Sequence, residues 1–270
     1  MKQLSICFSL LFTSCTFAQK GIDAMVQAEL NFAAYALTNG TKDAFIKFAD
    51  STGLIFEKGQ AINARAFWSQ KEKRPGILSW RPRFAEIAAS GDFGYSTGPW
   101  TFQPQTTSDS IIAAGHFFTV WHLDKSGEWR FLLDMGTSNA PIDSTSSLQK
   151  IQSPKNKSYS NDSNLLKVEY DFIRVYNQKP EQAYHAFLSH QSILNRERMN
   201  YATMATDQDF IIASYIQPVT LIPIDAGIAP SGDLGFVYGE AIYNGIKQNY
   251  LHIWRHEQKG WKIALEVIQH

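Results

Sequence analysis

Ser90-Gly91-Asp92-Phe93-Gly94-Tyr95-Ser96-Thr97-Gly98 returns 141 residues later as Ser231-Gly232-Asp233-Leu234-Gly235-Phe236-Val237-Tyr238-Gly239. The same shift aligns further identical residues upstream, namely Pro82 with Pro223, Ala85 with Ala226, Ile87 with Ile228 and Ala88 with Ala229. Outside this stretch, Glu29-x-x-Phe32 corresponds to Glu169-x-x-Phe172, and Val120-Trp121 corresponds to Ile253-Trp254. A shift of this size is the length of a domain. The repeat therefore predicts a tandem duplication of one fold.

Length and charge support two domains and exclude some partners. The chain has 270 residues, with 25 Lys and Arg against 25 Asp and Glu. This length suits two domains that each bury a core. Balanced charge offers no broad positive field to attract nucleic acid or anionic lipid. We therefore expect no nucleic-acid partner.

The N-terminus is typical of an export signal. Lys2 precedes an apolar run over residues 4–12, and Thr16-Phe17-Ala18 places small residues before a cut at Gln19. Residues 1–18 thus read as a signal peptide of a secreted or periplasmic protein, since the apolar run is too short to span a membrane. Phe12-Thr13-Ser14-Cys15 also resembles a lipobox, so a lipoprotein acylated at Cys15 is the alternative.

The cysteines carry little weight in the mature chain. Cys7 and Cys15 are the two cysteines of the sequence, and both precede the predicted cut. Cleavage before Gln19 would leave no thiol for a disulfide or a metal site.

The first domain is expected over residues 20–143. Apolar residues recur at helical spacing from Ile22 to Leu37 and stop at Asn39-Gly40, and Thr41 is expected to cap a second helix. A short strand over 54–56 and a helical turn over 63–68 should follow. Alternating and β-branched residues then predict strands over 78–88, 93–102, 113–123 and 129–135.

The second domain should repeat this order over residues 165–270. Residues 144–164 are mostly polar and predict a flexible linker. One helix should run to about Asn177 and another should start at Pro180. Strands are predicted over 210–216, 219–224, 235–242, 248–256 and 261–268. The predicted fold class is α+β, with two tandem cone-shaped domains in which helices precede a curved antiparallel sheet.

Three stretches carry a resemblance to a known superfamily: Trp80-Arg81-Pro82, residues 89–100 and residues 115–121. They resemble the nuclear transport factor 2-like, or SnoaL-like, superfamily, which includes ketosteroid isomerase, and in particular a secreted bacterial branch of undefined function. The resemblance implies a cystatin-like cone with a pocket at its open end. It also implies pairing through the sheets, either between the two domains or in a homodimer. One fold hosts many activities, so no reaction follows.

Strand alternation divides the candidate ligand-binding residues between two faces. Tyr95 lies on the opposite face from Trp100, and His116 lies on the opposite face from Phe117. The period does not decide which face lines a pocket. Trp80, Tyr95, Trp100, Tyr35 and His116 are the candidates for an apolar ligand site, and ordinary core packing is the alternative for each.

Asp134 is the candidate acid–base residue, with His116 as its partner. Glu266 occupies the matching place in the second domain, and a pocket wall would raise the pKa of such a carboxyl. A solvent-facing strand residue is the alternative. Where ketosteroid isomerase carries its proton-abstracting aspartate, this chain has Phe56, with Glu57 one residue away, and the match of the isomerase tyrosine to Tyr35 has no firm register. Isomerase chemistry is therefore not supported.

Other signatures point to no cofactor and no metal. The sequence has no phosphate loop, no nucleophile elbow and no His-Glu-x-x-His, and His252 and His256 fall on a predicted strand. Arg196 and Arg198 suit either an anionic ligand or a solvated pair. We expect domain 1 to bind a small, largely apolar molecule. The alternatives are a lyase, isomerase or hydrolase, and a non-catalytic scaffold with a dimer-like pairing of domains.

Overall fold

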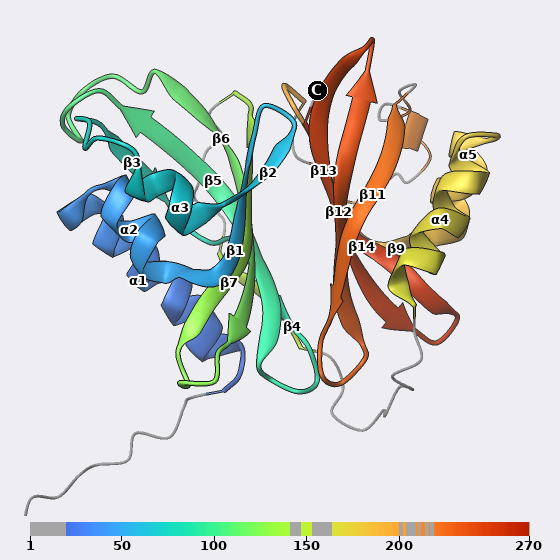
Figure 1. Ribbon diagram of the computed structural model, residues 1–270. Helices are drawn as coiled ribbons and strands as arrows, with labels where there is room; N and C mark the ends of the chain where they lie inside the picture. Colours follow the sequence, from blue (N-terminus) through green and yellow to red (C-terminus); the bar gives the residue numbers. More distant parts are fainter. Residues whose placement is uncertain are drawn as a thin grey trace, which may run out of the picture.

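The protein forms two α+β domains whose sheets face each other, with the helices on the outer sides (Figure 1). The computed structural model describes residues 20–140, 147–152, 164–199, 202–203, 209, 212–213, 216 and 219–269. The predicted signal peptide, with Cys7 and Cys15, lies outside these residues, as does most of the predicted linker. The predicted fold class is confirmed.

Domain 1 begins with helices and continues into a strongly bent sheet. Its elements are α1 (Ile22–Asn39), α2 (Thr41–Phe48), β1 (Ala49–Glu57), β2 (Gln60–Asn63), α3 (Ala64–Ser69), β3 (Ile77–Trp80), β4 (Phe84–Ile87), β5 (Phe93–Gln103), β6 (Ala113–Leu123) and β7 (Trp129–Ser138). The strand order is β2-β1-β7-β6-β5-β4-β8, where β8 spans Gln149–Gln152, and β3 also pairs with β5. The pair β1 and β7 is parallel, whereas β5, β6 and β7 form the expected antiparallel meander.

Domain 2 repeats this arrangement. Its elements are α4 (Leu165–Tyr176), α5 (Pro180–Phe187), β9 (Leu188–Arg196), β10 (Ala202–Thr203), β11 (Thr220–Ile228), β12 (Leu234–Tyr243), β13 (Ile246–Glu257) and β14 (Gly260–Ile268). The strand order is β10-β9-β14-β13-β12-β11, with β9 and β14 parallel. Pro180 stands at the start of α5, as expected, because its missing N–H has no helical partner there.

The repeated sequence forms the same turn in both domains. Ala88 N donates to Phe93 O over 2.9 Å, and Ala229 N donates to Leu234 O over 2.8 Å. Gly91 and Gly232 have φ of 71° and 73°, a conformation that glycine adopts without steric cost. The two turns also meet, since Ser90 N donates to Ser231 Oγ over 3.0 Å.

Three local predictions need correction. Thr41 is the first residue of α2, and Gly40 precedes it without a side-chain cap. The strand predicted over 78–88 is divided into β3 and β4, because Pro82 lacks the N–H that a strand would use. Within the strand predicted over 210–216, Ile212 and Ala213 are helical, Ile216 is in no strand, and the remaining residues lie outside the described parts.

The predicted linker contains a strand. β8 (Gln149–Gln152) pairs in parallel with β4 at the edge of the first sheet, and Gln149 N donates to Arg83 O over 2.9 Å. Polar composition concealed this strand because an edge strand needs backbone pairing more than apolar side chains. Residues 144–146 and 153–163 lie outside the described residues.

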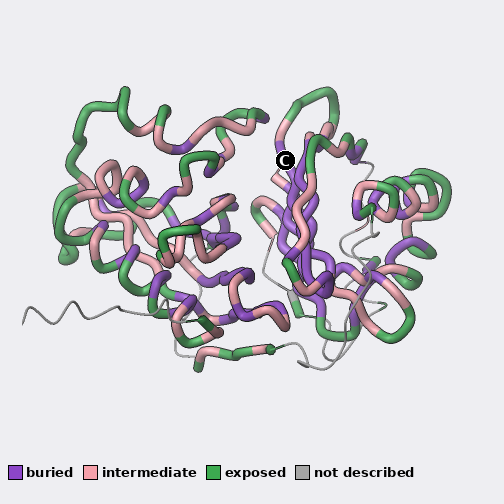
Figure 2. The backbone as a smooth tube through the Cα atoms, turned by 60° about the horizontal axis from the view of Figure 1, so that its bottom comes forward, coloured by how far each residue is buried: buried purple, intermediate pink, exposed green. Residues whose placement is uncertain are grey.

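Three apolar clusters hold the molecule together. One lies between helices and sheet in domain 1, another in the same place in domain 2, and the third joins the two sheets. In the third cluster, the rings of Phe93 and Phe236 stack at 6.2 Å. Buried residues follow the strands, whereas the loops and outer helix surfaces are more exposed (Figure 2). The inner face of each sheet is thus covered by the other domain, and the remaining face belongs to the cone.

Candidate functional site

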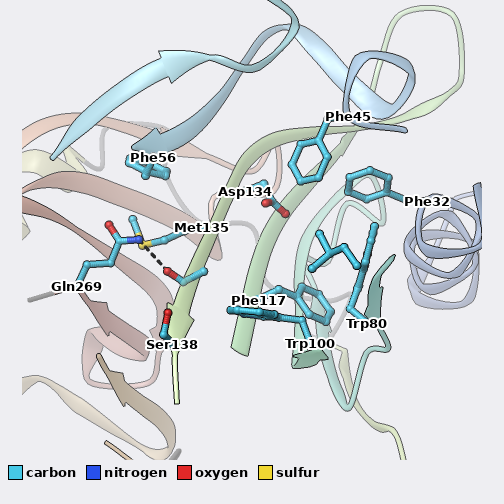
Figure 3. A pocket seen from close by; sticks show the side chains of 12 residues that line it. Phe32, Phe45, Phe56, Trp80, Trp100, Phe117, Asp134, Met135, Ser138 and Gln269 are labelled. Atoms are coloured by element: carbon cyan, nitrogen blue, oxygen red, sulfur yellow. Dashed lines mark hydrogen bonds between the residues drawn. The ribbon is translucent and has the colours of Figure 1, made fainter. Parts of the chain in front are cut away.

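A cavity of about 290 Å³ opens between the helices and the concave sheet of domain 1. Its wall consists mainly of aromatic and apolar side chains (Figure 3): Phe32, Phe45, Phe56, Leu78, Trp80, Trp100, Phe117, Asp134, Met135, Gly136, Ser138 and Gln269. A wider lobe of about 700 Å³ adjoins it and shares several of these residues, including Asp134 and Gly136. An apolar wall with few polar groups is the usual composition of a small-molecule site.

Asp134 of β7 is the carboxyl group on this wall. It lies opposite Thr119 of β6, whose hydroxyl donates to Asp134 Oδ2 over 2.9 Å. Asp134 is half-buried and lines both lobes, and in Figure 3 its carboxyl group points toward the rings of Phe32 and Phe45. Burial, and in second place the charge of Glu29, raises the pKa of Asp134 to about 8, against the effect of the Thr119 bond.

Glu29 of α1 lies behind the cavity wall and was not among the predicted site residues. It is fully buried and accepts hydrogen bonds from Trp80 Nε1 at 2.6 Å, Ser96 Oγ at 2.6 Å and Trp121 Nε1 at 2.8 Å. Burial raises the pKa of Glu29, and these hydrogen bonds oppose the rise. Two signals in the sequence mark it: an acid on an apolar helix stripe, and the recurrence of Glu29-x-x-Phe32 as Glu169-x-x-Phe172.

Glu29 and Asp134 form a coupled pair of acids. Among the described residues, neither carboxyl forms an ion pair with a lysine, arginine or histidine. The charge of Glu29 adds to the effect of burial on Asp134, whose pKa of about 8 lets this carboxyl keep its proton near neutral pH. Such a pair can donate a hydrogen bond to a ligand, exchange a proton with it, or compensate its positive charge.

The structure brings three of the predicted site residues together. Trp80 and Trp100 line the cavity with Asp134. Trp80 donates to Glu29, and Trp100 Nε1 donates to Thr137 O over 3.2 Å.

Tyr95 and His116 lie on the other face of the sheet, toward domain 2. Tyr95 OH donates to Glu86 Oε2 over 2.9 Å, within the cluster that joins the sheets. His116 lies opposite Thr137 and is 3.4 Å from Asn139 Nδ2, and burial lowers its pKa to about 4. The structure therefore does not bring His116 to Asp134, since alternation along β6 directs His116 away from the side that Thr119 shares with Asp134.

Tyr35 also lies away from the cavity wall. Its ring packs against Phe48 at 6.0 Å, and Lys47 Nζ lies 4.1 Å from the ring centre.

Domain 2 carries a different set of side chains in the same positions. Glu266 of β14 lies opposite His252, as Asp134 lies opposite Thr119. Arg196 Nη2 is 3.0 Å from Glu266 Oε1, and His252 Nε2 is 3.0 Å from Glu266 Oε2. Burial alone would raise the pKa of Glu266, but the charge of Arg196 and the bonds from His252 and Tyr184 lower it to about 2.

Buried side chains occupy the described part of the cone of domain 2. The parallel pairs Ile55 with Asp134 and Leu194 with Glu266 place Arg196 where domain 1 has Glu57. Arg196 is fully buried, so the anion-binding alternative for this residue is replaced by an internal ion pair. Glu169, the counterpart of Glu29, accepts from Trp254 Nε1 over 2.8 Å and lies 3.0 Å from His252 Nδ1.

The described residues were also compared with the patterns of a metal site and of a membrane-spanning helix. No three His, Cys, Asp or Glu side chains among them gather as metal ligands would. None of their helices is both long and apolar enough to cross a membrane.

Comparisons with known proteins give similarity of fold. No family model matches the chain, and no curated protein matches it. One similar solved structure is a nuclear transport factor 2-like protein from Cytophaga hutchinsonii, with 14% sequence identity and a TM-score of 0.33, covering 40% of this chain and 97% of that one. A second is a nuclear transport factor 2-like protein of unknown function from Shewanella oneidensis, with 17% identity and a TM-score of 0.33, covering 42% of this chain and 96% of that one. A third is a protein of unknown function with a cystatin-like fold from Nostoc punctiforme, with 11% identity and a TM-score of 0.31, covering 39% of this chain and 86% of that one.

Proposed function

We propose that domain 1 binds a small, largely apolar molecule in the cavity beneath α1 and α2, with Asp134 as the polar contact. The observation that carries this proposal is the aromatic wall around a carboxyl group that can keep its proton. The corresponding position in domain 2 is occupied by internal ion pairs. A ligand in domain 1 would supply the contacts that Arg196 and His252 supply to Glu266.

Binding is tested with N-phenyl-1-naphthylamine, a neutral dye that fluoresces in apolar sites. Gly136→Ile should abolish the dye signal. Domain 2 has an isoleucine, Ile268, at the equivalent position, and the same side chain in domain 1 would occupy the cavity. The Cβ of the new side chain would meet nothing closer than 3.6 Å. Tyr95→Phe is the control, since Tyr95 faces domain 2. Equal dye binding by Gly136→Ile and the unchanged protein would place the dye elsewhere and refute the proposal.

A second candidate function is proton transfer at a bound molecule. It is favoured by the pKa of Asp134, raised to about 8, which lies near the pH at which a general acid or base works best. Glu29 would replace His116 as the partner of Asp134. Small ketones in deuterium oxide, followed by NMR, would reveal exchange at the carbon next to the carbonyl. Exchange lost in Asp134→Asn with dye binding retained would support this function, and exchange at the uncatalysed rate would contradict it.

For domain 2 we propose a non-catalytic role as the partner that covers the sheet of domain 1. The domains 20–143 and 165–270 would be duplicated copies, joined by residues 144–164, and paired in place of two subunits. The common turns at Gly91 and Gly232 support the duplication. Sedimentation should give the mass of one chain, and limited proteolysis should cut first between the domains. A stable dimer, or first cleavage within a sheet, would contradict this arrangement.

We further propose export and removal of residues 1–18. N-terminal sequencing of the protein after expression in a bacterium should begin at Gln19. A lipid-modified Cys15 at the N-terminus would instead support the lipoprotein alternative.

A further inference from the structure

Domain 2 holds a cation of its own at the point where domain 1 has a cavity. The guanidinium of Arg196 is fully buried and reaches Glu266 across the cone, and the ring of His252 lies between Glu266 and Glu169, 3.0 Å from each. Both acids of domain 2 are thereby compensated. The two acids at the same positions in domain 1, Glu29 and Asp134, form no ion pair among the described residues.

Different residues at two equivalent positions of the domains explain this contrast. The position of Arg196 is held by Glu57, and that of His252 is held by Thr119. Domain 1 thus keeps both carboxyl groups of the cone but neither cation. A carboxyl in an apolar cavity is costly as an anion unless a positive charge accompanies it.

We propose that the ligand of domain 1 is a small organic cation, an ammonium or guanidinium group on an apolar body, held between Asp134 and the aromatic wall. This inference rests on the function proposed above and names the class of its ligand. The rings of Phe32, Phe45, Trp80, Trp100 and Phe117 surround the space in front of Asp134 (Figure 3). Aromatic faces attract a cation by their quadrupole, most strongly where water is excluded.

The charged groups near Asp134 agree with a cation in the inner cavity. The carboxyl of Glu29 in α1 lies close enough to Asp134 to act on its charge. Within the described chain, the wall of the inner cavity contains no lysine, arginine or histidine. The remaining charged side chains line the wider lobe, namely Glu57, Glu72, Lys42, Lys71, Lys73 and Arg74. Three of these bases already have contacts: Lys42 with Ser69 O and Lys71 O, Lys71 with the Phe67 ring, and Lys73 with Asp43. An anionic ligand would find no positively charged side chain on the wall of the inner cavity, within the described chain.

Proton linkage adds a second signature. A bound cation stabilises the carboxylate form of Asp134, whose pKa is raised to about 8 in the free protein. Cation binding below this pH therefore releases a proton, and the affinity should rise with pH by up to about tenfold per unit before levelling above pH 8. A neutral ligand of the same shape should show no such rise.

The test compares phenyltrimethylammonium with tert-butylbenzene, which have the same shape and differ in charge. Binding is followed by the change in tryptophan fluorescence, to which Trp80 and Trp100 of the cavity wall contribute, at pH 6 and pH 8.5. The cation should bind at least tenfold more tightly than tert-butylbenzene at pH 8.5, and Asp134→Asn should reduce this ratio to near one while tert-butylbenzene still binds. Asp23→Asn is the matched control, because Asp23 pairs with Lys150 on the surface.

The outcomes separate the two proposals. If tert-butylbenzene binds as tightly as the cation, or if Asp134→Asn keeps the ratio, the cation inference is overturned and the apolar site stands. If neither compound binds, and N-phenyl-1-naphthylamine binds no better than to Gly136→Ile, both proposals fail.

Discussion

Gly136 of β7 and Ile268 of β14 occupy the same position in the two domains. Gly136 lies opposite Phe117, and Ile268 lies opposite Tyr250. Gly136 lines the cavity of domain 1, whereas Ile268 is fully buried in the core of domain 2. One side chain at this position thus contributes to whether the cone is open or filled.

This relationship predicts that substitutions at the two positions have unequal effects on stability. Ile268→Ala should lower the free energy of unfolding by about 2–5 kcal/mol, because it leaves a cavity in a packed core. Gly136→Ala should change it by less than about 1 kcal/mol, since its methyl group enters existing space. Urea denaturation followed by circular dichroism measures both. A neutral Ile268→Ala would show that the cone of domain 2 is not closely packed.

Asp134 should make the protein less stable as pH rises. Its pKa is about 8 in the folded state against 3.8 for the ordinary group, so the folded state binds the extra proton between these values. The free energy of unfolding should therefore fall between pH 4 and 8, by up to about 1.4 kcal/mol per unit. Asp134→Asn should remove this slope and be the more stable form at pH 8. Parallel curves for the two proteins would contradict the raised pKa.

Glu266 should have the opposite pH dependence. Its pKa is lowered to about 2 from 4.5, so its contribution is present above pH 4.5 and is lost as pH falls toward 2. Glu266→Gln should cost about 3–5 kcal/mol at pH 7, because Arg196 and His252 would stay buried without their partner. Thermal and urea unfolding measure the loss. A variant as stable as the unchanged protein would refute the ion-pair network.

Arg255 and Glu86 should couple the two domains. Arg255 Nη2 lies 2.6 Å from Glu86 Oε2, Nε also contacts this carboxylate, and Glu86 is fully buried. Arg255→Met alone should cost about 3–5 kcal/mol by leaving that charge unpaired. Adding Glu86→Leu should recover much of the loss, which a double-mutant cycle measures. Additive losses would show that the two side chains act independently.

Strand positions were predictable where period and turn chemistry agreed. β6 has the predicted bounds, and the repeated turns around Gly91 and Gly232 form as expected, because φ near 70° suits glycine. Trp80, Trp100 and Asp134 were predicted as site residues and line the cavity. Tyr95 and His116 were predicted with them but face domain 2, because period alone does not identify the inner face.

By itself, the sequence determined the helix pair that opens each domain, the antiparallel strands that follow it and the repeated glycine turns, since these depend on neighbouring residues. The tertiary structure alone decided which face of each sheet became a cone and which became the contact between domains. It also decided that Glu29 approaches Asp134, 105 residues away along the chain, and that Arg196 compensates Glu266. Burial and charge compensation depend on groups that only folding brings together, so the acid at the same position pairs with cations in domain 2 and lines a cavity in domain 1.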